Sequence, residues 1–270
     1  MEHNNTTKKR GTRDAQEIRP IKITYNICEY AAASALFELG KTKILCAISM
    51  QNQVPHFLKG KKEGWLTCEY ALLPMSTDPR STRQSTGVQR NGRSVEISRF
   101  IGRVLRSVMD FSVFPDKTIT VDCDVIHADG STRVASINAA SLCLEIAQEY
   151  WLNKNTIQKP FLKERIYALS IGTVENKIYV DLDTKEDNVA TSDFNFVISA
   201  SNQLIEILGG SEKQSLAWDQ FEEIQKIAKK AVIEVQNSIA EAHTVSLQNE
   251  TIVSVKKAPL FGLQNRLMQK

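Results

Sequence analysis

The stretch TITVDCDVIHADGSTRVASINAAS, residues 118–141, contains a strand, a short loop and the start of a helix. Its first half alternates between apolar and polar side chains, which is typical of a strand with one buried face. The apolar face is formed by Ile119, Val121, Cys123 and Val125. The second half is rich in alanine and serine, small residues that let a helix pack closely against a sheet. The stretch therefore predicts a strand that leads through a loop into a closely packed helix.

The loop in this stretch carries the groups that bind an anion. A helix start supplies free backbone N–H groups and the positive end of the helix dipole. Hydroxyl groups and a guanidinium add further donors, so phosphate is the natural candidate for Gly130, Ser131, Thr132 and Arg133. An ordinary helix start, capped by Ser131 or Thr132, explains the same residue types. The nucleotide-binding patterns G-x-x-x-x-G-K-[ST] and G-x-G-x-x-G are absent from the sequence.

A second cluster is acidic and lies between residues 181 and 193. Asp187 and Asp193 are expected to flank a short turn between two strands, where their carboxylates could converge. Oxygen ligands of this kind suit Mg²⁺ or Mn²⁺. A solvated acidic turn is the alternative interpretation. The other members of the cluster are Asp181, Asp183 and Glu186.

A third cluster is basic and lies in a polar segment, residues 74–92, that is punctuated by glycine and proline. Such a segment is expected to form an exposed loop. Its arginines Arg80, Arg83 and Arg90 are suited to contacts with the phosphate backbone of RNA. A loop that is merely well solvated would look similar. Arg93 follows this segment and precedes an amphipathic helix that begins at Ser94.

The remaining pattern has strands in groups, separated by a few long helices. Strands are predicted within residues 23–50, with a turn at Gly40 and Lys41, and over the segments 167–174, 177–183, 193–201 and 203–210. Gly209 and Gly210 are expected to form a turn. A long helix is predicted from about Ser215 to Ile239. This order favours one α+β domain over a regularly alternating doubly wound sheet.

Composition narrows the class of protein further. The chain of 270 residues, 42% of them hydrophobic, is long enough to bury a full core, and its formal net charge is only +3. Five cysteines lie mostly in apolar runs without C-x-x-C spacing, which is typical of reduced thiols in a cytoplasmic protein. The N-terminus has no apolar signal segment, and no apolar run could span a bilayer. We therefore expect a cytoplasmic protein with no membrane partner.

Segments along most of the chain, taken in order, resemble the bacterial ribonuclease PH family. The resemblance covers roughly residues 10–242 and is carried by residues 10–23, 40–49, 54–74, 91–110, 118–141 and 169–198 and by the final long helix. It implies the fold of ribosomal protein S5 domain 2, in which mixed sheets pack against long helices. It also implies a catalytic domain over residues 14–243. Residues 1–13 are polar and basic and are expected to form a flexible N-terminus. Residues 244–270 have no counterpart in the family and are expected to form an extension of unknown structure.

The same resemblance implies an activity. Members of this family are phosphate-dependent 3′-to-5′ exoribonucleases that trim tRNA precursors, release nucleoside 5′-diphosphates and add nucleotides in the reverse reaction. Inorganic phosphate would be the co-substrate, Mg²⁺ or Mn²⁺ the cofactor, RNA the partner, and a cytoplasmic homohexamer, a trimer of dimers, the assembly. Two other functions stay open at this point: a metal-dependent hydrolytic exoribonuclease, and an RNA-binding ring subunit without catalytic activity.

Individual residues match positions with known roles in the family. The resemblance assigns phosphate binding to Arg93, Gly130, Ser131, Thr132 and Arg133, and it assigns catalysis and metal binding to Asp187 and Asp193. Arg80 and Arg83 match arginines that contact RNA, and the charge of the loop adds Arg90. The sequence departs from the family pattern at Met75, Asn91 and Ser131 and in the stretch GGSE, residues 209–212. Ser131 is notable because glycine is usual there and because a side chain is strained wherever φ is positive.

Overall fold

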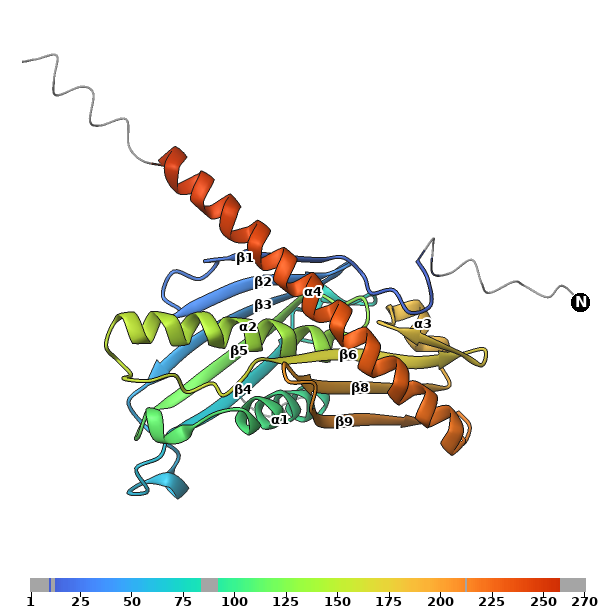
Figure 1. Ribbon diagram of the computed structural model, residues 1–270, viewed down its shortest axis with the longest axis horizontal. Coiled ribbons are helices and arrows are strands. Elements are labelled where there is room, and N and C mark those ends of the chain that lie inside the picture. Colours follow the sequence, from blue (N-terminus) through green and yellow to red (C-terminus); the bar gives the residue numbers. More distant parts are fainter. Residues whose placement is uncertain (1–9, 11–12, 84–91, 212, 258–270) are drawn as a thin grey trace, which may run out of the picture.

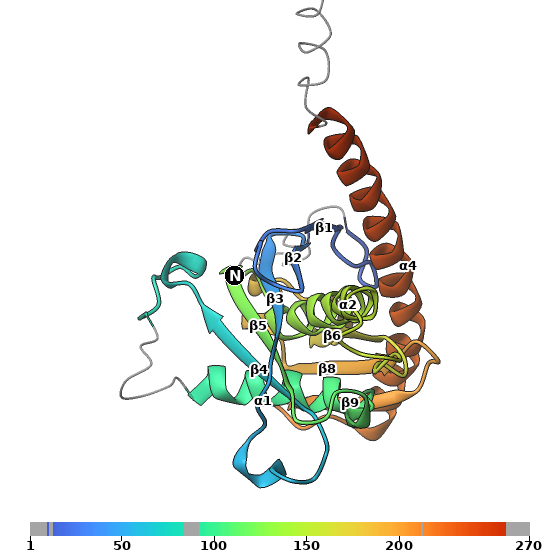
Figure 2. The ribbon, with the colours of Figure 1, turned by 90° about the vertical axis from the view of Figure 1, so that its left-hand side faces the viewer.

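The computed structural model describes residues 10, 13–83, 92–211 and 213–257, with side chains up to residue 248. These residues form two sheets with a helix between them (Figures 1 and 2). The first sheet has five strands in the order β1-β2-β3-β5-β4, and the second has four in the order β7-β6-β8-β9. The expected α+β class, with mixed sheets and long helices, is therefore confirmed.

The first sheet is antiparallel except at one edge. Strands β4 and β5 run parallel and are connected through helix α1, whereas the other neighbouring pairs are antiparallel. The predicted turn at Gly40 and Lys41 lies between β2 and β3, and Gly40 has a φ of 56°. The strands are β1 (Ile21–Tyr25), β2 (Ala33–Leu39), β3 (Thr42–Gln51), β4 (Trp65–Leu72) and β5 (Thr118–His127).

The second sheet is antiparallel throughout and consists of β6 (Ile166–Val174), β7 (Lys177–Val180), β8 (Ser192–Ser199) and β9 (Leu204–Ser211). The predicted turn at Gly209 and Gly210 is wrong, because both residues lie in β9 and pair with Phe194 and Asp193. Gly209 has a φ of 153°, and a Cβ atom there would lie 2.1 Å from the backbone oxygen of Asp193. The glycine thus permits a close approach of two strands.

Among the described residues, four α-helices complete the fold: α1 (Gly92–Ser107), α2 (Thr132–Asn153), α3 (Thr184–Val189) and α4 (Trp218–Lys257). The same part of the chain contains the short 3₁₀ helices η2 (His56–Leu58), η3 (Pro74–Ser76) and η4 (Phe111–Val113). Helix α4 crosses the second sheet and extends past the rest of the fold (Figure 1). It continues through residue 243, so the segment predicted as an extension begins inside a helix.

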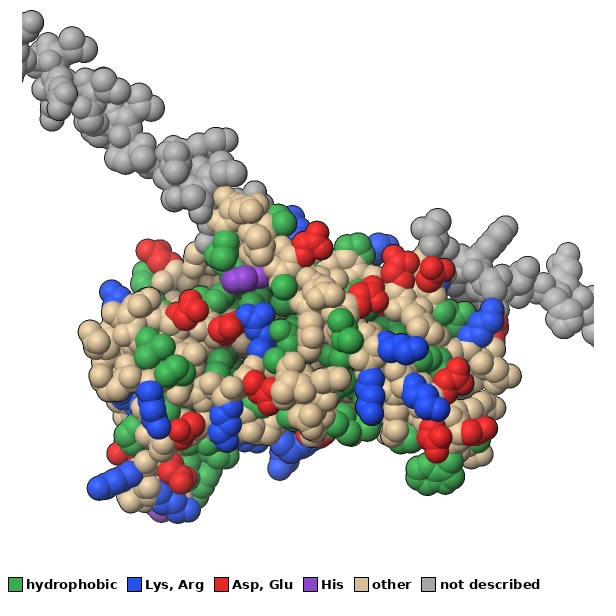
Figure 3. All heavy atoms as spheres, viewed as in Figure 1, with side chains coloured by type: hydrophobic (Ala, Val, Ile, Leu, Met, Phe, Trp, Pro, Cys, Tyr) green, Lys and Arg blue, Asp and Glu red, His purple; other side chains and the backbone are tan. Residues whose placement is uncertain are grey.

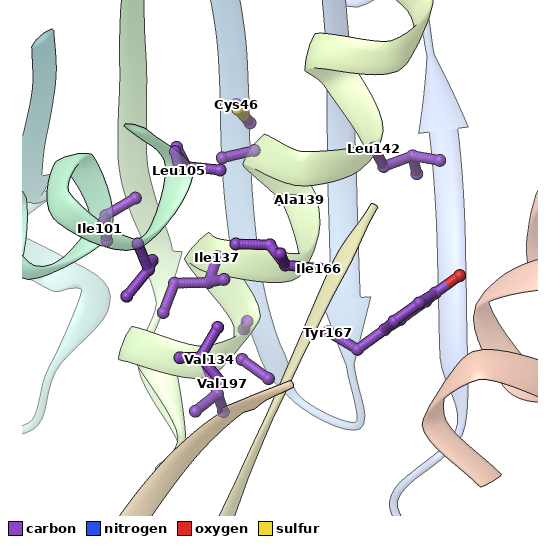
Figure 4. Close-up of a cluster of buried hydrophobic side chains, with 14 of the residues drawn as sticks. Cys46, Ile101, Leu105, Val134, Ile137, Ala139, Leu142, Ile166, Tyr167 and Val197 are labelled. Atoms are coloured by element: carbon purple, nitrogen blue, oxygen red, sulfur yellow. The ribbon is translucent and has the colours of Figure 1, made fainter. Parts of the chain in front are cut away.

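Helix α2 lies in the centre of the core. It contacts β2 and β3 of the first sheet and β6 of the second, and its apolar side chains meet those of both sheets (Figure 4). Ile137, Ala139 and Leu142 are fully buried there, as is Cys46 of β3. The small residues predicted to allow close packing therefore serve a helix that is covered on two sides. The buried face predicted for residues 119–125 is confirmed as well.

The outer surface shown in Figure 3 carries basic and acidic side chains interspersed with each other. This mixture agrees with the nearly balanced total of 34 basic and 31 acidic side chains. Within the described residues, no helix is both long and apolar enough to cross a bilayer.

Candidate active site

A cleft of about 1330 Å³ opens where strand β5 ends and where helices α1 and α2 begin. Helix α3 and the start of β8 form its other side. The structure brings the predicted anion-binding residues and the predicted pair of aspartates to this cleft. Its lining includes Arg93, Gly130, Ser131, Thr132, Arg133, Asp187 and Asp193. Two long helices thus direct their N-terminal ends, where backbone N–H groups lack partners within the helix, toward one space.

The predicted basic loop reaches the cleft in part. Arg83 lines the cleft, while Arg80 is exposed but does not line it. Arg90 and Asn91 lie outside the described residues. The expectation of full exposure is wrong for the start of the segment, because Pro74 and Ser76 are buried in η3. The backbone oxygen of Ser76 accepts a hydrogen bond of 2.8 Å from the N–H of Ala128, which joins this segment to the end of β5.

The glycine loop is held against the acidic segment by its backbone. Gly130 has a φ of 75°, and a Cβ atom at this position would lie 2.4 Å from the backbone oxygen of Leu182. The hydroxyl of Thr42 donates to the Gly130 oxygen at 2.7 Å and accepts from the Asp129 N–H at 3.0 Å. Only glycine permits this approach, so Gly130 determines how closely the loop and the segment with Asp187 can meet.

Ser131 occupies the N-cap position of α2 in a left-handed conformation, with φ 56° and ψ 24°. Its hydroxyl makes no capping hydrogen bond. Instead it donates to the backbone oxygen of Leu182 at 2.9 Å and lies 2.7 Å from the hydroxyl of Ser170. The interpretation of this loop as a side-chain-capped helix start is thus not supported for Ser131. The side chain therefore joins the loop to β6 of the second sheet and to the segment before α3.

Two side chains at the start of α2 are placed for contact with an anion. Arg133 donates from Nη2 to a Glu96 carboxylate oxygen at 2.9 Å, while its buried Nε has no hydrogen-bond partner among the described residues. Thr132 accepts a hydrogen bond of 3.0 Å from the hydroxyl of Tyr70. A buried N–H without a partner is costly, and an anion in the cleft is the kind of group that would satisfy it.

Tyr70 was not among the predicted site residues, yet it lines the same cleft as Arg93 and Arg133. Burial raises the pKa of the Tyr70 phenol above its ordinary value. The positive charges of Arg93 and Arg133 act in the opposite direction on this pKa. A tyrosine at a buried position of a strand needs a hydrogen-bond partner for its hydroxyl. This requirement is the feature of the sequence that could have pointed to Tyr70.

The two predicted aspartates come from different elements. Asp187 is exposed in α3 and Asp193 is half-buried at the start of β8, so the two aspartates flank a turn between a helix and a strand, and not between two strands as expected. Asp193 pairs with glycines on both sides, Gly172 in β6 and Gly210 in β9, so neighbouring side chains do not crowd it. The amide of Asn195 donates to its carboxylate at 3.4 Å.

The donors at this pair fit a hard cation, because carboxylate oxygens are the ligands that Mg²⁺ and Mn²⁺ prefer. Across the described residues, no group of three or more histidine, cysteine, aspartate or glutamate side chains is arranged to hold a metal ion. A cation at Asp187 and Asp193 would therefore need water or phosphate oxygens to complete its coordination. Mg²⁺ characteristically retains several such ligands.

The other acidic residues of the cluster have structural contacts. Asp183 caps α3 in a capping box with Glu186. Asp181 is buried against Arg19, and Arg13 also donates to its carboxylate, at 3.0 Å. Burial alone would raise the pKa of the Asp181 carboxyl, but the hydrogen bonds and charge of Arg19 hold it below its ordinary value. The sequence does not reveal this pairing, because its partners are far apart along the chain.

Arginines, helix starts and a carboxylate pair in one cleft are the groups expected of an enzyme that handles phosphorylated substrates. Comparisons with known proteins identify the class. The family described as "3' exoribonuclease family, domain 1" matches residues 17–148, and domain 2 of the same family matches residues 165–231. Ribonuclease PH of Tropheryma whipplei (strain Twist) is 41% identical over 221 residues, which cover 82% of this chain and 90% of that relative.

The chain therefore belongs to the 3′ exoribonuclease family of ribonuclease PH, as its sequence predicted. Solved structures agree on the fold. Rrp46 of rice (Oryza sativa) has a TM-score of 0.68 at 18% identity and covers 85% of this chain and 97% of its own. The structure titled "archaeoglobus fulgidus exosome with RNA bound to the active site" has a TM-score of 0.70 at 20% identity, with 83% and 90% covered.

Proposed function

We propose that this protein is a phosphate-dependent 3′-to-5′ exoribonuclease that releases nucleoside 5′-diphosphates and, in reverse, adds nucleotides to RNA 3′ ends. The observation that carries the proposal is that Arg93, Thr132 and Arg133 line the same cleft as Asp187 and Asp193. Membership in the ribonuclease PH family supports the same activity. Precursor tRNA 3′ ends are the proposed substrate, and the cytoplasm is the proposed compartment.

Inorganic phosphate is the proposed nucleophile, held at the start of α2. Arg93 and Arg133 would neutralise it, the Thr132 hydroxyl would donate to one oxygen, and the backbone N–H groups of the loop from Gly130 would donate to others. The buried Nε of Arg133, which lacks a partner among the described residues, supports an anion at this point. Neutralising and aligning two anionic groups is the main task of such a site.

The second reactant is the last phosphodiester of the RNA. An oxygen of the bound phosphate attacks this phosphorus, a new P–O bond forms, and the bond from phosphorus to the preceding 3′-oxygen breaks. The leaving 3′-oxygen takes up a proton. Asp187 or Asp193 would deliver it if protonated, and where both are ionised to hold a metal ion, the proton would come from water. Mg²⁺ or Mn²⁺ held by these two carboxylates would supply positive charge where negative charge builds up on the transferred group. Because a phosphodiester is exchanged for a diphosphate bond, the reaction runs in both directions.

RNA is proposed to enter past the arginines of the segment before α1. Arg83 lines the cleft, and Arg80 is exposed three residues before it, so both can follow a phosphate backbone. Arg90 keeps the same proposed role. A homohexamer built as a trimer of dimers is the proposed assembly, and size-exclusion chromatography with light scattering of the purified chain tests it.

The products of RNA degradation test the proposed activity. Purified protein is incubated with a tRNA carrying a 3′ extension, with Mg²⁺ and with or without inorganic phosphate, and the products are separated by chromatography. Nucleoside 5′-diphosphates formed only when phosphate is present are the expected result. Nucleoside monophosphates without phosphate would indicate a hydrolytic exonuclease instead, and binding of RNA with no degradation would indicate a ring subunit without activity.

A further inference from the structure

We propose that Tyr70 is a positioning residue for the attacking phosphate, and that it acts by fixing the hydroxyl of Thr132 so that the hydroxyl donates to the phosphate. The inference rests on the proposed function, since it assigns a role at the same anion site. Its basis is the hydrogen bond of 3.0 Å from the Tyr70 hydroxyl to Thr132 Oγ1, which joins the first sheet to the first residue of α2.

Tyr70 is held rigidly by its surroundings. It lies in β4, pairs with Cys123 of the parallel neighbour β5, and is only 4% exposed. Its ring is therefore fixed in the sheet while its residue lines the cleft. A hydroxyl on such a support keeps a constant position, whereas the Thr132 side chain alone could rotate about χ1 between staggered positions.

The chemistry of a hydroxyl explains why this contact matters. The threonine hydroxyl has one proton to donate and two lone pairs that accept. Phosphate oxygens accept hydrogen bonds, so Thr132 assists only when its proton points into the cleft. Because Tyr70 donates to Thr132, it occupies a lone pair and leaves the threonine proton for another acceptor. The pair thus forms a chain of donors that ends at the anion.

Tyr70 keeps its proton under ordinary conditions. Burial raises the pKa of the phenol above its ordinary value, and the positive charges of Arg93 and Arg133 offset this only in part. The phenol is accordingly a donor throughout the neutral pH range, and Thr132 has a constant partner.

A double-mutant cycle with Tyr70→Phe and Thr132→Val tests the proposal. Tyr70→Phe removes only the hydroxyl, and Thr132→Val keeps the branched shape. We expect Tyr70→Phe to raise the KM for phosphate roughly threefold to tenfold, the effect of one lost hydrogen bond, with the KM for RNA unchanged. In the Thr132→Val background the same substitution is expected to have no further effect. Tyr25→Phe is the control, because it removes a hydroxyl that contacts His243 outside the cleft.

Two outcomes would overturn the role of Tyr70: an unchanged KM for phosphate in Tyr70→Phe, or an equal loss with and without the Thr132 hydroxyl. The second outcome would mean that Tyr70 acts on the fold rather than through Thr132. Calorimetric titration with inorganic phosphate measures the same weakening without any turnover. Failure of the proposed function is separate from both, because it appears in the unaltered protein as an absence of nucleoside diphosphates.

Discussion

The carboxylate of Asp181 accepts three hydrogen bonds from Arg19, one from its backbone N–H at 2.8 Å and two from its guanidinium at 2.8 and 2.6 Å. Both side chains are less than a tenth exposed. Arg19 also donates to the backbone oxygens of Asp129 and Leu182. This buried ion pair thus connects three segments of the chain. They are the residues before β1, the residues between β5 and Gly130, and the residues between β7 and Asp187.

Replacement of Arg19 by methionine tests this connection. Methionine is about as long as the aliphatic part of the arginine side chain but lacks the guanidinium, so the Asp181 carboxylate is left buried without its main partner. We expect the free energy of unfolding to fall by about 3–5 kcal/mol, the usual cost of breaking a buried pair from one side. Urea denaturation followed by circular dichroism measures this loss.

Lys22→Gln provides the control for this experiment. Lys22 lies 3.8 Å from Glu38, but its side chain is 75% exposed, so water screens the pair. Its loss should cost less than about 1 kcal/mol. Equal effects of the Lys22 and Arg19 variants would contradict the importance of burial for the Arg19 pair.

The same pair gives the stability a pH dependence with a definite sign. The pKa of the Asp181 carboxyl is lower in the folded protein than its ordinary value of 3.8, despite burial, because of Arg19. The carboxylate therefore contributes stability above pH 3.8, and this contribution disappears as the pH falls through the lowered folded-state pKa. The difference in unfolding free energy between the unaltered protein and Asp181→Asn should be constant near neutral pH and should shrink in acid. A difference that grows in acid would reverse the assigned sign.

The sequence predicted local features well and contacts across the chain poorly. The alternation in residues 118–126 was sufficient for β5, because period and burial are linked in every strand. Gly130 and Arg133 were found because a loop and a helix start are adjacent in the chain. The pairing of Arg19 with Asp181 was missed, since their sequence separation of 162 residues leaves no local pattern.

The wrong prediction of a turn at Gly209 also arises from a contact that the local sequence does not reveal. Adjacent glycines usually mark a turn, but here Gly209 lies in a strand that passes very close to Asp193. Glycine is required here because a neighbouring strand lies close. A short sequence window around Gly209 does not show which strand will be its neighbour. Tyr70 was likewise not predicted as a site residue, because its partner Thr132 lies 62 residues further along the chain.

Gly209→Ala tests whether the close approach to Asp193 is the reason for a glycine at this position. A Cβ atom at Gly209 would lie 2.1 Å from the Asp193 backbone oxygen, and its φ of 153° is strained for any other residue. We expect a loss of about 2–4 kcal/mol in unfolding free energy and slower phosphorolysis, because Asp193 must move. Differential scanning calorimetry and the product assay measure the two effects.

The neighbouring glycine gives a matched control. A Cβ atom at Gly210 would meet no heavy atom within 4 Å, so Gly210→Ala should change stability by less than about 1 kcal/mol. Both variants add the same methyl group to the same strand. Similar losses of stability in the two variants would mean that alanine is unfavourable anywhere in this part of β9, whether or not the position approaches Asp193.

The role of Ser131 in stability can be tested by two substitutions that should differ in their effect. Ser131→Gly removes the strain of a left-handed backbone, at about 1–2 kcal/mol, and also removes the hydrogen bond to Leu182, so the net change should be within about 1 kcal/mol. Ser131→Ala keeps the strain and loses the hydrogen bond, and should cost about 1–3 kcal/mol. Thermal unfolding of both variants decides the point. Equal destabilisation of the two would show that the hydroxyl contacts outweigh the strain.

Arg133→Ala tests the proposed phosphate site most directly. Its partner Glu96 is 45% exposed, so loss of this ion pair should change stability by less than about 1 kcal/mol. Loss of the guanidinium from the cleft should lower kcat/KM for phosphate about 10²-fold to 10³-fold, as expected when one donor to a reacting anion is removed. Arg133→Lys should recover only part of this, because lysine keeps the charge but not the paired N–H donors. Steady-state kinetics at varied phosphate concentrations measure both variants.

The control for Arg133 is Arg103→Ala on the neighbouring helix. Arg103 pairs with Glu206 of β9 and does not line the cleft, so its replacement removes an equal charge without touching the proposed anion site. Phosphate kinetics should then match those of the unaltered protein. If Arg133→Ala retained full phosphate-dependent turnover while it stayed folded, the start of α2 would not hold the nucleophile, and the phosphate would have to bind elsewhere in the cleft.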